Sequence, residues 1–235
     1  MKKILLFIFV ATIPLFLSQC SLQNARPSNT EKVAQQRNFG QMLHIINNDQ
    51  SVTSAYRLHD KYITYTKPKE FGTTIGSVAT NQHVFMTAYL KGENEKRWTQ
   101  SISVLANKAV DMNAFSLEKL YQGQMGFYTK YCVPTKISSL QDFSDILHVG
   151  KYESMAFVLA CGEMISKDLL GSLETFHVNI KVPDGYYSII WSERGPNGDK
   201  PITINKTKWV QRFRQLEPVG LYDHFPPRKE DSSAP

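Results

Sequence analysis

Alternating hydrophobic and polar positions predict that strands fill the middle of the chain. Between residues 52 and 90, β-branched and aromatic residues recur around turn signals at Pro68 and Gly72, which is typical of several strands. Residues 98–105 alternate in the same way and predict a further strand. The apolar run over residues 154–161 is bounded by polar residues and predicts a fully buried central strand.

The clearest pattern is a β-hairpin near residue 184. Apolar residues alternate with polar ones over 176–182, and the alternation resumes over 187–191. Between them, Pro183-Asp184-Gly185 supplies turn residues, with proline presetting one dihedral and glycine permitting a positive φ. The sequence therefore predicts an antiparallel pair with one buried face.

Helical spacing of apolar residues predicts helices between and after the strands. We expect a helix over 31–47, a second one that begins at Asn113 and ends at Gly123–Gly126, a short one over 140–147, and a last one capped by Asn205 and ended by Pro218. No regular βαβ alternation is present. The expected class is therefore α+β, an antiparallel sheet with helices packed on one face.

The first nineteen residues have the features of a secretory signal peptide. Lys2 and Lys3 form a positive start, and residues 4–17 form an uncharged apolar run. A permanent transmembrane helix needs about 20 apolar residues, so this run is too short for one. Residues 1–19 are therefore expected to direct export and to be removed.

The end of this segment, Leu17-Ser18-Gln19-Cys20, resembles the lipobox of bacterial lipoproteins, although Gln19 replaces the usual small residue. The resemblance implies that Cys20 is lipidated and becomes the mature N-terminus. Ser21 in place of Asp would then direct the protein to the outer membrane. Ordinary cleavage after Cys20 is the alternative, and it would release a soluble periplasmic or secreted protein.

Composition changes divide the exported part into three stretches. Residues 20–36 are polar and predict a flexible tether. Residues 37–224 hold the predicted elements without a Pro/Gly/Ser linker and are expected to form a single globular domain. Residues 225–235 contain two prolines and mixed charges and predict a disordered tail.

Charge argues against a nucleic-acid partner. Losing Lys2 and Lys3 with the signal peptide lowers the formal net charge from +6 by two, to +4, and the remaining basic residues are spread along the chain. The expected partners are therefore the membrane, through a lipid anchor, and an envelope protein or glycan.

Two cysteines remain after Cys20. In an oxidising compartment Cys132 and Cys161 predict a disulfide. The alternative is a catalytic thiol at Cys161, with His148 or His177 as its base. No CxxC or zinc-ligand spacing is present.

The sequence contains no motif for a metal, a phosphate loop or a serine nucleophile, so we expect no cofactor and lean against an enzyme. The leading hypothesis is a non-catalytic binding or assembly component of the bacterial envelope. The alternative is a hydrolase with acid and base residues from distant parts of the chain, and a pocket holding two or more of four residues would favour it. These are Glu163, His177, Glu193 and Asp199.

One face of the hairpin is the expected binding surface. Tyr186, Ser188 and Ile190 alternate with the buried residues, so they should share the opposite face of the sheet. Exposed aromatic side chains on a sheet are suited to contacts with peptides or glycans.

Overall fold

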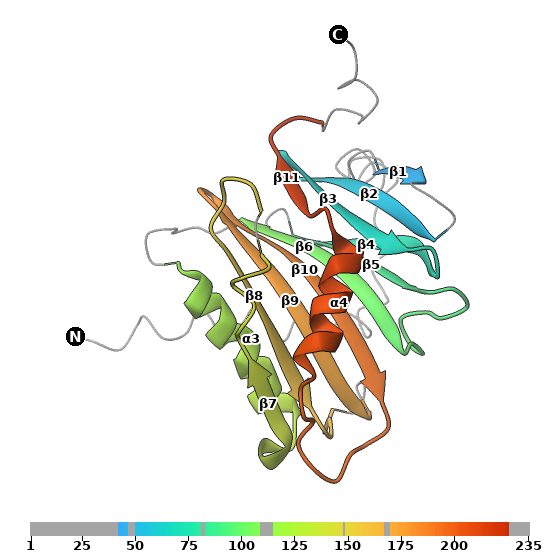
Figure 1. Cartoon of the computed structure of the whole chain (residues 1–235), viewed down its shortest axis with the longest axis vertical. Coiled ribbons are helices and arrows are strands. Elements are labelled where there is room, and N and C mark those ends of the chain that lie inside the picture. Colours follow the sequence, from blue (N-terminus) through green and yellow to red (C-terminus); the bar gives the residue numbers. More distant parts are fainter. Residues whose placement is uncertain are drawn as a thin grey trace, which may run out of the picture.

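The structure, a computed structural model, describes residues 42–46, 50–80, 83–108, 115–147, 149–166 and 170–225. These ranges hold two antiparallel sheets and two α-helices (Figure 1). The predicted signal peptide, Cys20, the tether and residues 226–235 of the tail lie outside them.

The smaller sheet has four strands in the order β1-β2-β3-β11. Its strands are β1 (Met42–Ile46), β2 (Ser51–Leu58), β3 (Lys61–Pro68) and β11 (Gly220–Tyr222). Strand β1 lies where the sequence predicted the C-terminal part of a helix, so that prediction is wrong for 42–46. These five residues pair in register with β2 from Met42–Tyr56 to Ile46–Val52, which satisfies backbone groups that a helix would have satisfied internally.

The larger sheet has seven strands in the order β4-β5-β6-β10-β9-β8-β7. Its strands are β4 (Phe71–Thr80), β5 (His83–Leu90), β6 (Gln100–Lys108), β7 (Ile137–Leu140), β8 (Ser154–Cys161), β9 (Ser172–Val182) and β10 (Gly185–Gly195). The strands expected over 52–90 and 98–105 are confirmed. Strand β8 is the second strand from one edge of the sheet and is not central.

The predicted hairpin is confirmed as β9 and β10, joined by the two residues Pro183 and Asp184. Gly185 has a different role from the expected one. It is not among the glycines with positive φ, but a Cβ at this position would clash with the carbonyl oxygen of Asn107 on β6. Glycine is needed here because a neighbouring strand approaches closely.

Helix α3 (Leu117–Tyr131) begins later and ends later than the sequence predicted. Its N-cap is Ser116, whose side chain accepts a hydrogen bond from the Lys119 backbone, whereas Asn113 lies outside the described residues. The helix continues through Gly123 and Gly126 because the buried side chains Tyr121 and Tyr128 hold both of its halves against the sheet. The short helix expected over 140–147 is replaced by a loop after a 3-10 turn (Pro134–Lys136) and β7.

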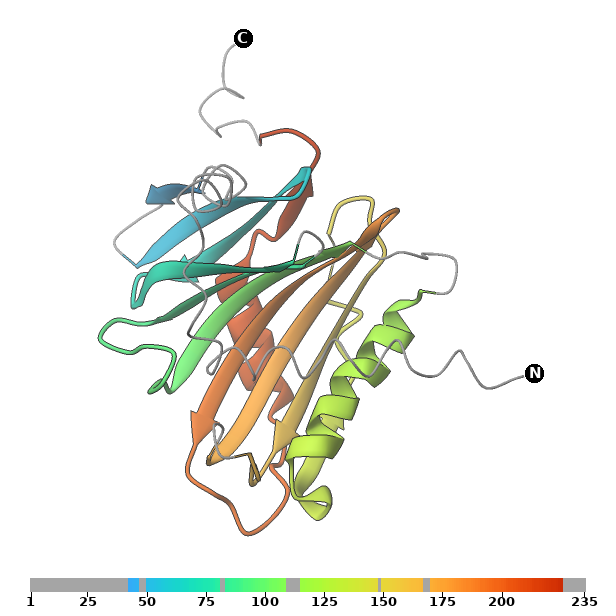
Figure 2. The ribbon, with the colours of Figure 1, turned by 180° about the vertical axis from the view of Figure 1, so that it is seen from behind.

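Helix α4 (Lys206–Leu216) is capped by Asn205, as predicted. Figures 1 and 2 show that α4 lies on one face of the seven-stranded sheet and α3 on the other. Contacts along β9 agree: Phe176 stacks on Trp209 of α4, while the next residue before it, Thr175, bonds to Tyr128 of α3. The expectation of helices over one face is therefore wrong. Both faces of β9 carry residues that need cover, so each face takes a helix.

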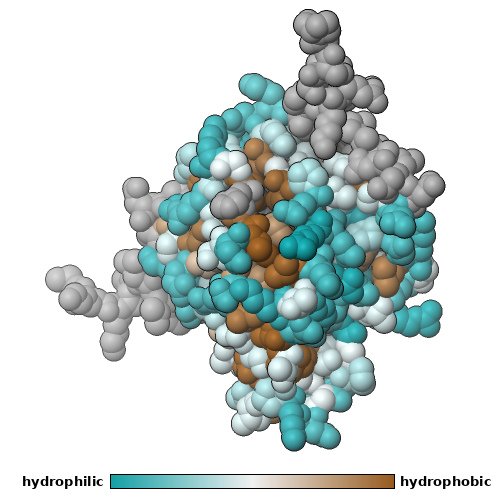
Figure 3. All heavy atoms as spheres, viewed as in Figure 1, coloured by the Kyte–Doolittle hydropathy of each residue, from teal (hydrophilic) through white to brown (hydrophobic). Residues whose placement is uncertain are grey.

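One core joins the two sheets on the α4 side. The Tyr187 hydroxyl on β10 donates a 2.8 Å hydrogen bond to the Leu58 carbonyl on β2, and Phe71 packs edge-on against Trp191 at 5.2 Å. A second, smaller core lies beneath α3 and includes Tyr121, Phe157 and Leu159. On the α4 side, apolar patches remain at the surface between hydrophilic side chains (Figure 3).

Candidate functional site

The four side chains that would favour a hydrolase do not share a pocket. His177 on β9 faces α3, whereas Glu193 on β10 lies on the α4 face and pairs with Arg212 at 2.8 Å. Glu163 pairs with Lys136, and Asp199 is exposed in the loop after β10. The fold thus separates residues that the sequence left free to converge.

Glu193 belongs to a charged cluster that attaches α4 to the sheet. Glu174 lies directly opposite Glu193 on the paired strands. Lys208 contacts both carboxylates, at 2.7 Å and 3.2 Å, and the Trp209 indole donates to Glu174 at 3.0 Å. Two like charges on facing strands repel, so these contacts with α4 offset the repulsion and hold the helix in place.

His177 is buried in a chain of hydrogen bonds beneath α3. Its Nε2 lies 2.7 Å from the Thr175 hydroxyl, which lies 2.7 Å from the Tyr128 hydroxyl, and its ring stacks on Phe157. Burial lowers the pKa of His177 to about 3, so the imidazole stays neutral at ordinary pH. This histidine links helix and sheet, and its Nδ1 has no hydrogen-bond partner.

The predicted disulfide is present. Cys132, the residue after α3, is bonded to Cys161 at the end of β8 with an S–S distance of 2.05 Å. A sulfur held in a disulfide is not a free nucleophile, which removes the catalytic-thiol alternative in this state. His148 lies outside the described residues.

The expected binding surface on the hairpin is not an open face. Ser188 is fully buried and donates to Asn179, and the Tyr186 ring stacks on Phe115. Burial raises the pKa of the Tyr186 hydroxyl to about 12. Ile190 is half-buried on the same face. These side chains pack inside the domain because the stretch before α3 and α3 itself cover this part of the sheet.

Two other kinds of site can be addressed for the described ranges. There, His, Cys, Asp and Glu side chains form no group of three suited to a metal ion. Within the same ranges, neither helix is long and apolar enough to cross a membrane.

One structural feature has no role within the fold: half of the outer edge of β8. Strand β7 has four residues and pairs only with the second half of β8, from Leu140–Val158 to Ile137–Cys161. On that side, residues 154–157 have no partner strand in the described part of the chain. Sheet edges of this kind present backbone groups that are able to pair with another chain.

The hydrogen bonds around β8 show which residues face this edge. The Lys181 N–H donates to Glu153 on the β9 side, and the Gly162 N–H donates to Lys136 on the β7 side. Antiparallel strands alternate these directions, so even-numbered residues of β8 point their N–H and C=O groups away from β9. Ser154 and Ala156 therefore face the open edge, and the described backbone supplies them no partner there.

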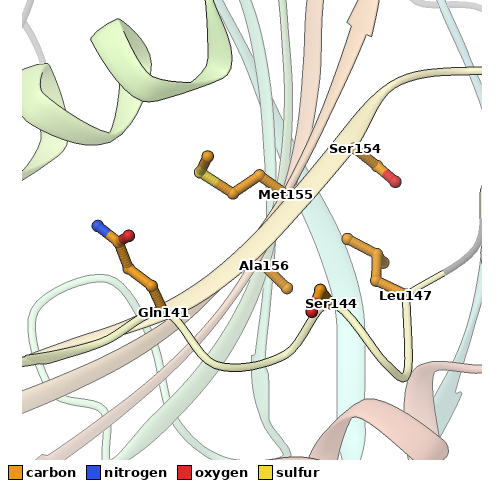
Figure 4. A pocket seen from close by; sticks show the side chains of 6 residues that line it. All are labelled: Gln141, Ser144, Leu147, Ser154, Met155 and Ala156. Carbon is orange, nitrogen blue, oxygen red and sulfur yellow. The ribbon is translucent and has the colours of Figure 1, made fainter.

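A cavity of about 230 Å³ lies beside this open half-edge. In Figure 4 the loop after β7 bends away from β8 and then returns, and the hollow lies between loop and strand. Phe143 anchors the loop, because its ring is fully buried and packs edge-on against Phe176 at 5.2 Å. The cavity is lined by Gln141, Ser144, Leu147, Ser154, Met155 and Ala156.

No protein-family model, curated protein or solved structure matches this chain. The candidate site therefore stands on its geometry: an open β8 half-edge beside a cavity.

Sequence reasoning did not find this site. The apolar run over 154–161 was interpreted as a fully buried strand, and six of its eight residues are buried. Ser154 and Met155 are only half-buried, and a polar residue at the start of an apolar run is a weak signal of an edge. The length of the neighbouring strand decides whether the edge is open, and that length depends on tertiary packing.

Proposed function

We propose that this chain is an exported, lipid-anchored protein of the bacterial envelope that acts as a non-catalytic binding or assembly component. Its signal peptide, the lipobox-like Cys20 and the polar tether over 20–36 support export and anchoring to the outer membrane. A tether of this kind lets a folded domain reach a partner while it remains at the membrane surface.

The observation that carries the binding role is the contrast between occupied side chains and an open backbone edge. The charged cluster around Glu174 and Glu193 attaches α4, and the chain from Tyr128 to His177 attaches α3. The β8 half-edge, in contrast, presents backbone groups beside a cavity. An unsatisfied backbone group is stabilised by a partner that completes its hydrogen bond. We expect the partner to be an envelope protein.

The anchor is tested by the intact mass of the mature protein from native membrane and soluble fractions. We expect a membrane-bound species that starts at Cys20 and carries acyl groups, and a soluble species from the variant Cys20→Ser. A wild-type soluble species that starts at Ser21 would overturn the anchor and the tether.

The binding role is tested on the same membrane preparation by native mass spectrometry after mild detergent extraction. We expect a hetero-complex of fixed stoichiometry that contains the mature chain. A chain that is monomeric in every extract, while a known complex in the same membranes stays intact, would overturn the binding role.

A further inference from the structure

We propose that the open half-edge of β8 binds one extended segment of an envelope protein, which adds to the seven-stranded sheet as a short strand. This inference rests on the proposed function and deepens it, because it names the chemistry of the partner and the place where it binds. Strand addition of this kind uses backbone hydrogen bonds for affinity and side-chain pockets for specificity.

The arrangement of donors and acceptors favours a polypeptide backbone. Ser154 and Ala156 present an N–H and a C=O each, two residues apart along an extended strand. A strand rises about 3.3 Å per residue, so the two sets of groups repeat at about 6.6 Å. A second extended backbone has the same repeat and is able to satisfy all four groups together.

Ala156 makes the strongest demand for such a partner. The residue is only 4% exposed, yet its outward N–H and C=O have no partner in the described backbone. A buried backbone group without a hydrogen bond costs about 1–3 kcal/mol, so an occupant that pairs with it binds favourably.

The size of the cavity favours a side chain over a free small molecule. At about 230 Å³ it is smaller than typical ligand pockets, which hold about 300–1,000 Å³. Alternate side chains of an added strand point to opposite faces of the sheet, so one of them would enter the cavity. The lining side chains Leu147, Met155 and Ala156 suit an apolar residue there.

A second copy of this chain fits the edge poorly. Because Ser154 and Ala156 carry the outward groups, a two-fold pairing of β8 strands would set Ser154 opposite Ala156 of the second copy. Tyr152 of that copy would then lie opposite Val158, in the place where Leu140 already pairs with Val158. A separate segment of about four residues avoids this clash, because it ends before it reaches β7.

The test is site-specific photo-crosslinking in the full-length protein in its native membrane. A benzophenone amino acid at Gln141, which lines the cavity and is exposed, should crosslink to one contiguous segment of one protein. The same amino acid at Arg214, exposed on α4, is the matched control and should not label that segment.

Two variants of Ser154 separate backbone pairing from side-chain contact. Ser154→Pro removes the outward N–H at the first residue of β8, where proline is tolerated, and Ser154→Ala keeps this N–H. We expect the proline variant to lower the crosslink yield by about tenfold or more and the alanine variant to leave it unchanged. Ser144→Trp fills the cavity without touching the strand and should lower the yield as well.

Hydrogen exchange supplies the signature of an added strand. The Ser154 and Ala156 amides should exchange slowly in the complex and quickly in the free protein, while Met155 and Phe157, which face β9, stay protected in both. Normal protection of Phe157 in each variant shows that the sheet is folded.

Several outcomes would overturn strand addition. These are a crosslink that survives both Ser154→Pro and Ser144→Trp in folded protein, a crosslink to a second copy of the chain, and a crosslink to glycan. A hetero-complex that persists in these variants would leave the proposed binding role intact. An absence of any complex in native extracts would overturn the binding role and strand addition together.

Discussion

Lys208 on α4 contacts Glu174 on β9, with 2.7 Å between Nζ and Oε1. The same ammonium group lies 3.2 Å from Glu193, the residue opposite Glu174 on β10. The two carboxylate side chains are only 17% and 19% exposed. One cation thus holds two neighbouring, largely buried anions, and α4 depends on it for its attachment.

Replacing this cation should destabilise the fold. We expect Lys208→Met to lower the free energy of unfolding by about 2–3 kcal/mol, because it leaves two partly buried carboxylates opposite each other. Lys206→Met is the control, since Lys206 pairs with Asp142, whose side chain is 70% exposed, and its loss should cost less than about 1 kcal/mol. Urea titrations of both variants measure the difference. Equal losses would show that the buried cluster is not special.

The disulfide should stabilise the folded state. Cys132 and Cys161 are 29 residues apart and both fully buried. We expect the double variant Cys132→Ala/Cys161→Ala to lose about 3–4 kcal/mol of unfolding free energy in denaturant titrations, because its unfolded chain regains the entropy of the open loop. Reductant should destabilise the wild type and leave the double variant unchanged. A reductant effect on the double variant would contradict this assignment.

His177 should make the protein less stable in acid. Burial lowers its folded-state pKa to about 3, below the value of 6.5 for an unperturbed histidine. Between these values the unfolded chain binds more protons, so stability falls as pH falls, by about 1.4 kcal/mol per pH unit from this group. His177→Gln should flatten that slope. Denaturant titrations from pH 7.5 to pH 4 measure it, and parallel curves for the two proteins across the whole range would rule out the contribution of His177.

Phe143 should hold the outer wall of the cavity. Its buried ring packs against Phe176, and its carbonyl accepts a hydrogen bond from the Ile146 N–H. We expect Phe143→Ala to lower the unfolding free energy by about 3–5 kcal/mol and to speed amide exchange at Ile146. Ser144→Ala, at the exposed neighbouring position, should change neither quantity beyond about 0.5 kcal/mol. Unchanged exchange at Ile146 in the phenylalanine variant would show that the loop is held by other contacts.

Local patterns determined much of this fold because they describe interactions between residues close in sequence. The alternation around Pro183 and Asp184 predicted the β9–β10 hairpin, and Asn205 predicted the start of α4. The two cysteines predicted their own pairing, since two was the number left after export. Export, lipidation at Cys20 and the envelope location remain predictions from the sequence.

Tertiary structure decided the features that depend on neighbours distant in sequence. Met42–Ile46 became a strand because β2 offered its edge, and Tyr186 and Ser188 were covered because Phe115 and α3 pack over them. No spacing rule showed that β7 would stop at Leu140 and leave the first half of β8 open. A hydrophobic pattern records which side chains are buried, and an open edge is a property of backbone groups, which every residue carries alike. The sequence by itself therefore determined the elements and the destination of this protein, and only the packing of the elements decided which edge is left for a partner.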